Sequence, residues 1–227
     1  MLDPLSPRPY DVDIVLCVDV TAHTQAHLDR LKAWAPRLHA TIRRHIEDAC
    51  PKKPYESIRI KLVAFRDFAY DDEPLFESDF YAEDGVGEFT DMMSFLHPYG
   101  GGDEPESGSE AFALACKADW RRTHHCSHVI VMITDASAHP LGSSRDTCHY
   151  PYGMPQTLDE LADWVKGGVC PSNMRTILIT PAREPWTELR DRLPCVGLFP
   201  YDSVFSWEKD EDETMDSFCQ LVAQYSC

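Results

Sequence analysis

The stretch Asp13-Ile14-Val15-Leu16-Cys17-Val18-Asp19-Val20-Thr21-Ala22-His23 decides how this chain folds. Ile14 to Val18 is an unbroken run of apolar or thiol side chains, without the polar alternation of a strand that has one wet face. Such runs are typical of central parallel strands that are covered on both faces. Asp19, Thr21 and His23 then follow at every second position. Because ligands of open α/β sheets bind just outside the carboxyl ends of the strands, these three side chains are candidates for a binding site.

Further strands and helices alternate along the rest of the chain. Strands are expected over residues 58–68, 128–135, 175–180 and 195–200, with a short acidic edge strand over 75–81. Amphipathic helices are expected over 28–46 (kinked at Pro36), 89–96, 108–120, 158–166, 186–192 and around 215–225. The alternation predicts an α/β fold, a three-layer αβα, Rossmann-like, doubly wound and mostly parallel sheet. We expect a loose Pro-rich lead-in over residues 1–11 and a single domain over residues 12–227.

Composition narrows the class of partner. The 227 residues carry a formal net charge of −17, which argues against nucleic acid and anionic membrane surfaces, because both need clustered Lys and Arg. No apolar run approaches the roughly 18 residues that span a bilayer. The charge is compatible with metal ions or basic protein surfaces.

The cysteines indicate a reduced protein. There are nine of them, an odd number, without a C-x-x-C pair, and the acidic start of the chain does not resemble a signal peptide. We therefore predict nine free thiols and a cytoplasmic location.

Acidic and hydroxyl side chains follow several strands or their loops. Asp19 and Thr21 follow the first strand, Asp103 follows the triplet Gly100 to Gly102, and Asp135 ends the strand over 128–135. Strand ends that are distant in sequence meet at the switch point of a doubly wound sheet. Several hard oxygen ligands in one place suit Mg²⁺ or Mn²⁺.

These segments resemble the von Willebrand factor A (vWA) family. The resemblance rests on four segments in order, residues 19–23, 63–68, 100–106 and 133–136, and it extends from about Tyr10 to the end of the chain. His149-Tyr150-Pro151 is similar to the long loop of the intracellular branch found in α-kinase-linked proteins. The resemblance implies a vWA-type fold.

The resemblance also implies a metal-ion-dependent adhesion site that holds a divalent cation, Mg²⁺ or Mn²⁺. Asp19 and Thr21 match its first two ligands, Asp103 the later-loop ligand and Asp135 the final aspartate. His23 stands where the family pattern has Ser, and an imidazole is a poor ligand for Mg²⁺. The site is therefore expected to bind Mg²⁺ weakly, to prefer a transition metal, or to be degenerate.

Structural interpretations compete with these roles. Asp19, Thr21 and Asp103 are each suited to cap a helix. His124 to His128 matches no zinc spacing, and a polar loop is expected there. Cys148 and His149 lack a third orienting residue for nucleophilic catalysis.

Three functions remain open at this point. The first is a non-enzymatic adaptor that binds a partner protein at the strand-end face, and the resemblance implies kinase, phosphatase or AAA+ ATPase systems as partners. The second is a metal-dependent hydrolase or phosphoryl-transfer enzyme that uses Asp19, His23 (as the base), Asp103 and Asp135. No Walker loop, H-E-x-x-H or G-x-S-x-G motif supports it. The third is a metal-free interaction domain.

Overall fold

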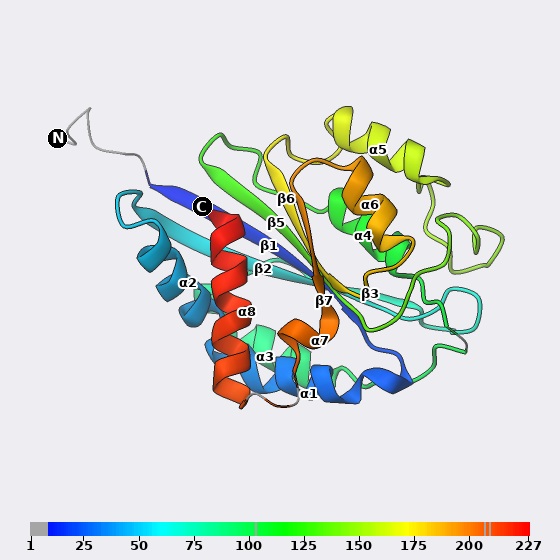
Figure 1. Ribbon diagram of the computed structural model, residues 1–227, viewed down its shortest axis with the longest axis horizontal. Helices are drawn as coiled ribbons and strands as arrows, with labels where there is room; N and C mark the ends of the chain where they lie inside the picture. The colour runs from blue at the N-terminus through cyan, green and yellow to red at the C-terminus, as the bar shows by residue number, and fades with distance from the viewer. Residues whose placement is uncertain (1–8, 103, 207, 209) are drawn as a thin grey trace.

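The computed structural model describes residues 9–102, 104–206, 208 and 210–227 (Figure 1). Its centre is a seven-stranded sheet in the order β3-β2-β1-β5-β6-β7, with β4 paired to β2. The strands are β1 (Tyr10–Asp19), β2 (Tyr55–Phe65), β3 (Leu75–Glu77), β4 (Tyr81–Ala82), β5 (Cys126–Ile133), β6 (Met174–Thr180) and β7 (Val196–Pro200). All pairs are parallel except those of β3 and β4 with β2. The predicted fold class, with a mostly parallel sheet, is confirmed.

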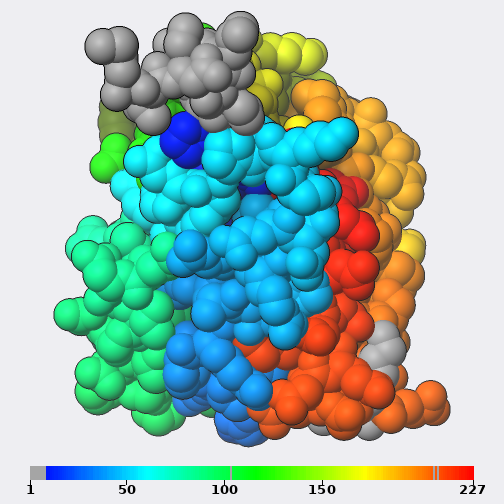
Figure 2. All heavy atoms as spheres, turned by 90° about the vertical axis from the view of Figure 1, so that its left-hand side faces the viewer, coloured from blue at the N-terminus to red at the C-terminus, as the bar shows by residue number. Residues whose placement is uncertain are grey.

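Helices cover both faces of the sheet and complete the three layers (Figure 1). One face carries α1 (Gln25–Trp34), α2 (Leu38–Ala49), α3 (Val86–Phe95), α7 (Tyr201–Val204) and α8 (Glu211–Ser226). The other face carries α4 (Gly108–Cys116), α5 (Leu158–Lys166) and α6 (Trp186–Arg192). Figure 2 looks onto the first face, where α1, α2, α3 and α8 lie side by side.

The core is divided by the sheet into two apolar clusters. Alternate residues of β1 supply them: Ile14, Leu16 and Val18 face the side of α1 and α8, whereas Val15 and Cys17 face α4. All five of these side chains are buried, as the unbroken apolar run predicts. The same holds for the runs 129–133 in β5 and 177–179 in β6. Burial on both faces explains why these strands lack polar alternation.

Most element boundaries follow the sequence pattern, and Pro36 interrupts the first long helix as expected. A 3₁₀ turn over Ala35–Arg37 separates α1 from α2 at that point. The first strand begins at Tyr10, earlier than the boundary drawn after residue 11.

The expected strand over residues 75–81 is two short strands instead. Between β3 and β4, the hydroxyl of Ser78 accepts a hydrogen bond from the backbone N–H of Leu62 at 2.9 Å. A side chain thereby replaces a backbone carbonyl in the ladder, and regular pairing stops. Both pieces lie at the edge of the sheet, as predicted.

Two further expectations need correction at the opposite end of the sheet. The helix over 108–120 ends at Cys116, and the indole N–H of Trp120 donates to the carbonyl of Ala115 at 2.9 Å, near that end. Residues Cys126 to His128 are not a polar loop but the buried start of β5.

The prediction of nine free thiols is wrong for one pair. Cys50, directly after α2, is disulfide-bonded to Cys227, and the other seven cysteines are free. The pairing is long-range, with a sequence separation of 177, so no local spacing in the sequence indicates it. Across the described residues, we find no helix with the length and apolar character needed to span a bilayer.

Candidate functional site

The candidate site lies where β1 and β5 end side by side. The two strands are parallel neighbours, and Val18 of β1 pairs with Ile133 of β5. Asp19 and Thr134 therefore emerge at the same carboxyl edge, which is the edge where open α/β sheets bind ligands.

Asp19 is fully buried and its carboxylate is held by uncharged donors. Its Oδ1 accepts hydrogen bonds from the Thr21 hydroxyl at 2.7 Å and from the Thr21 N–H at 3.0 Å. Its Oδ2 accepts from the Thr134 hydroxyl at 2.6 Å. Burial raises the pKa of Asp19, and these hydrogen bonds oppose that rise. Thr21 occupies the N-cap position of the 3₁₀ turn Ala22–Thr24, but its side chain forms no capping hydrogen bond and donates to Asp19 instead.

His27 of α1 contacts the backbone at the end of β1, next to the candidate site. One ring nitrogen, Nε2, lies 2.9 Å from the backbone oxygen of Asp19 and donates to it. The other, Nδ1, lies 2.8 Å from the Tyr201 hydroxyl and accepts from it. Burial lowers the pKa of His27, which favours this neutral tautomer. The contact joins α1 to α7 directly beneath the end of β1.

The glycine loop is held against the end of β1 by backbone hydrogen bonds. Tyr99 donates to the carbonyl of Val20 at 3.2 Å, and Ala22 donates to the carbonyl of Gly100 at 3.3 Å. Gly101 has a φ of +91°, and a Cβ at this position would lie 2.8 Å from the Cβ of Thr21. Only glycine allows this close approach without strain.

The result is a cleft of about 310 Å³ at the carboxyl edge of the sheet. It brings together three of the predicted site residues, Thr21, His23 and Asp135, and Asp19 lies below Thr21. His23 and Asp135 are exposed. Asp103 lies outside the described residues.

Two glutamates that the sequence analysis did not select also line the cleft. Glu106 is nearly buried, and its Oε1 would lie 2.6 Å from a Cβ on Gly101. Glu104 is exposed and forms an ion pair with Arg183. Both lie in the segment 100–106 that resembles the vWA family, close in sequence to the predicted ligand Asp103. This closeness is the feature of the sequence that could have identified them. The cleft is therefore acidic, which suits a cation.

Buried and partly buried polar groups also connect the loops around the cleft. Asp67, just after β2, is fully buried, and its Oδ2 lies 2.9 Å from Nε2 of His139. Its Oδ1 accepts from the N–H of Ala69 at 2.7 Å. Asp71 accepts from the N–H of Gly101 at 3.0 Å. The loop after β2 thereby fixes the glycine loop and the loop after β5 together.

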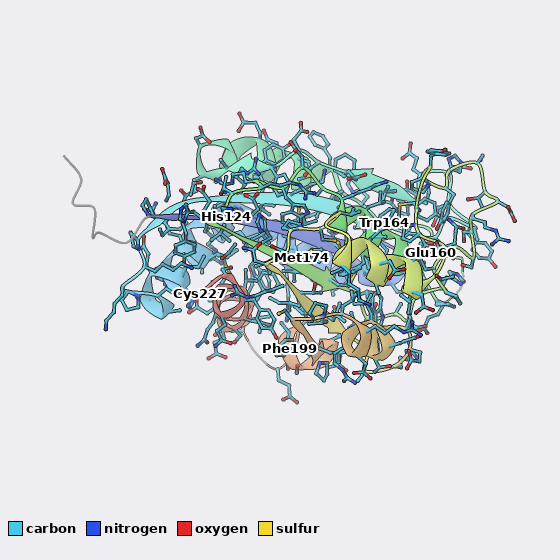
Figure 3. All side chains as sticks on the ribbon, turned by 90° about the horizontal axis from the view of Figure 1, so that it is seen from above. His124, Glu160, Trp164, Met174, Phe199 and Cys227 are labelled. Carbon is cyan, nitrogen blue, oxygen red and sulfur yellow. A yellow bond between two sulfur atoms is a disulfide. The ribbon has the colours of Figure 1, made fainter. Side chains whose placement is uncertain are left out.

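A separate cluster lies at the opposite end of β1. Asp13, Cys126 and His128 are buried, and their ligand atoms lie within 4.8 Å of one another, so this group could hold a metal ion. Figure 3 places the neighbouring His124 and Cys227 at this end of the molecule, far from Glu160 of α5.

The potential ligand atoms of this cluster already have partners. Asp13 accepts from Arg59 at 2.9 and 2.7 Å and from the Arg121 side chain and N–H, each at 2.8 Å. Burial raises the pKa of Asp13, but these arginine hydrogen bonds outweigh it and hold the pKa below its usual value. The ring nitrogens of His128 face the oxygens of Asn173 and Arg121 at 2.7 and 2.6 Å. A metal would have to displace these contacts, so the arrangement favours a structural ion-pair network.

Comparisons with known proteins bear on the fold alone. No family model and no curated protein matches the sequence. Among solved structures, the chain is similar to proximal thread matrix protein 1 from the mussel byssus, with a TM-score of 0.56 and 12% identity over 97% of this chain. It is also similar to the pilus adhesin SpaC of Lactobacillus rhamnosus GG in two forms, with TM-scores of 0.52 and 0.51 and identities of 11% and 9% over 98% of this chain.

The chain spans 49% of the mussel protein and 31% or 30% of the adhesin. At this identity the likeness supports the α/β fold with its mostly parallel sheet.

Proposed function

We propose that this chain is a non-enzymatic, vWA-type adaptor that binds a partner protein at the carboxyl edge of its sheet through a divalent cation. The observation that carries the proposal is the acidic cleft that joins Thr21, His23 and Asp135 above Asp19. The Thr21 hydroxyl donates a hydrogen bond to Asp19, so the lone pairs of the Thr21 oxygen remain available to a ligand. The resemblance to the vWA family implies that a carboxylate of the partner protein completes the coordination shell of the cation. It also implies that the partner belongs to a kinase, phosphatase or AAA+ ATPase system.

The enzyme alternative has less support from the geometry. In a hydrolase that uses Asp19, His23, Asp103 and Asp135, the buried carboxylate of Asp19 would need to reach a substrate. Both of its oxygens instead accept hydrogen bonds from threonines. The arrangement suits a positioning role for Asp19 better than a catalytic one.

Thermal unfolding with Mg²⁺ or Mn²⁺ against EDTA tests the proposal. Because the cation binds the folded chain, it should stabilise the wild type by about 2.7 kcal/mol at a hundredfold excess over its dissociation constant. Asp135→Ala should abolish the shift, while the exposed control Asp48→Ala should keep it. His23→Ser should increase the shift with Mg²⁺, since it restores a hard oxygen. If no metal shifts any of these proteins, the cation proposal is wrong and a metal-free interaction domain remains.

A further inference from the structure

A second surface of the molecule gathers exposed aromatic side chains. Among the described residues, five large hydrophobic side chains are exposed, and three of them line one groove: Phe76 at 41%, Phe95 at 77% and Tyr99 at 42%. The groove has a volume of about 1120 Å³, which exceeds the usual range for small-molecule pockets. Exposed apolar side chains that cluster in this way indicate an interaction site, whereas singly scattered ones are ordinary on protein surfaces.

The groove lies between β3 and one stripe of α3. Glu88, Asp91, Met92 and Phe95 of α3 line it, at the three- and four-residue steps that place side chains on one helix face. Opposite them, Phe76 pairs with Ala64 of β2 and so shares the sheet face that α3 covers. Apolar side chains therefore form the centre, and carboxylates stand along the helix side.

Within the described residues, β3 carries backbone groups on the side that faces away from β2. Pro74 accepts from the N–H of Arg66 at 2.8 Å, and Ser78 donates to the carbonyl of Leu62 at 3.0 Å. Alternate residues of an antiparallel strand face its partner, so the backbone groups of Leu75 and Glu77 point away from β2. Because β3 is the last strand on this side of the sheet, these groups face the open edge.

The side chains that line the groove carry mainly negative charge. Four exposed carboxylates line it, those of Asp72, Glu73, Glu88 and Asp91. In the described part of the chain, Arg66 is the one Lys or Arg in the lining. Its guanidinium donates to the carbonyls of Glu73 and His97, at 2.9 and 3.0 Å, and stacks 3.6 Å from the centre of the Tyr99 ring. The rim carboxylates thus present net negative charge to whatever enters.

From this geometry we infer that the groove binds an extended segment of another protein that carries apolar side chains and Lys or Arg together on one face, at every second position. The segment adds to the edge of β3 through the backbone of Leu75 and Glu77. Its apolar side chains pack on Phe76 and Phe95, and its cations reach the carboxylates of the rim. A second copy of this chain fits poorly, because its net charge of −17 would be repelled. The inference does not rest on the cation site.

Fluorescence anisotropy with a labelled synthetic peptide that carries leucines and lysines at every second position, with serine at the positions between, tests the inference on the intact chain. Phe95→Ser should weaken binding roughly tenfold, as expected for loss of an aromatic anchor. Glu88→Gln with Asp91→Asn should weaken it several-fold and reduce its dependence on salt. EDTA should leave the affinity unchanged.

Matched controls separate the groove from general attraction to an acidic protein. Tyr152→Ser removes a fully exposed aromatic elsewhere, and Asp48→Asn with Glu56→Gln removes two exposed acids outside the groove, so both should bind like the wild type. Three results would overturn the inference: a lysine–serine peptide that binds equally well, a glutamate–leucine peptide that binds equally well, or controls that weaken binding as much as the groove variants. Light scattering that shows a dimer dissociated by Phe95→Ser would assign the groove to self-association instead.

Discussion

Glu110 should make the stability of this protein depend on pH in a way that one substitution removes. It lies in the first turn of α4, fully buried. Its Oε1 accepts from the N–H of Gly142 at 3.0 Å and from the Tyr150 hydroxyl at 3.4 Å. Within the described residues its Oε2 has no hydrogen-bond partner. Burial raises the pKa of Glu110 from 4.5 to about 7, although the hydrogen bonds and His139 oppose the rise.

The direction and the size of this pH dependence follow from the difference between the pKa of Glu110 in the folded state and its pKa in the unfolded state. The folded state holds the proton more tightly than the unfolded state, so the stability that protonation provides is complete below pH 4.5 and is lost as the pH rises through 7. A difference of 7 − 4.5, or 2.5, in pKa at about 1.36 kcal/mol for each unit is about 3 kcal/mol lost by pH 8. Glu110→Gln keeps the acceptor oxygen and carries no charge, so it should lose none of this.

Urea unfolding at several pH values between 5 and 8 measures the effect. The free energy of unfolding of Glu110→Gln should exceed that of the wild type by an amount that grows by about 2.5 kcal/mol across this range. Glu56→Gln, at an exposed position on β2, should follow the wild type at every pH. Parallel pH profiles for wild type and Glu110→Gln would refute the assignment of a proton to the buried carboxyl.

Three further outcomes are expected. Asp13→Asn should cost about 3 kcal/mol in urea unfolding at pH 7, because it removes the carboxylate that pairs with the partly buried Arg59 and one of the two, Asp13 and Asp11, that pair with Arg121; a loss no larger than that of an ordinary surface change would contradict this. Gly101→Ala should lower the melting temperature more than Gly153→Ala and remove any Mg²⁺ shift, since both have positive φ but only Gly101 has neighbours within 4 Å of an added Cβ. Alkylation of the denatured, unreduced protein should modify seven cysteines by mass spectrometry, and nine after reduction; nine without reduction would mean that Cys50 and Cys227 are not bonded.

The buried strands β1, β5 and β6 could be predicted because both of their faces are covered. An unbroken apolar run such as Ile14 to Val18 has few alternatives in a chain that also carries amphipathic helices. The edge was harder to predict, because the division between β3 and β4 depends on one hydroxyl, that of Ser78, which replaces a backbone acceptor. The disulfide was not predictable for a related reason. Cys50 and Cys227 meet only after α2 and α8 have packed.

The candidate site was predictable in position but not in detail. Residues that end strands, such as Asp19 and Asp135, are fixed in space once the strand order is known. Thr134 lies within the segment 133–136 that resembles the vWA family, yet its hydrogen bond to Asp19 depends on the register of β5 against β1. Glu106 enters the cleft because its loop folds back along Ala138, which spacing in the sequence does not indicate.

The two buried aspartates of β1 explain why the cation proposal falls at one end of the strand and not the other. Asp13 accepts hydrogen bonds from two arginines, and its pKa lies below the usual value. In the described part of the chain, the hydrogen-bond donors of Asp19 are two threonines, which carry no charge, and its pKa is raised. The charge at Asp13 is therefore balanced within the fold, so a metal there would have to displace arginines. At Asp19 the carboxyl group lies beside an acidic cleft and has no charged donor, so a bound cation would supply the positive charge that the hydrogen-bond donors lack.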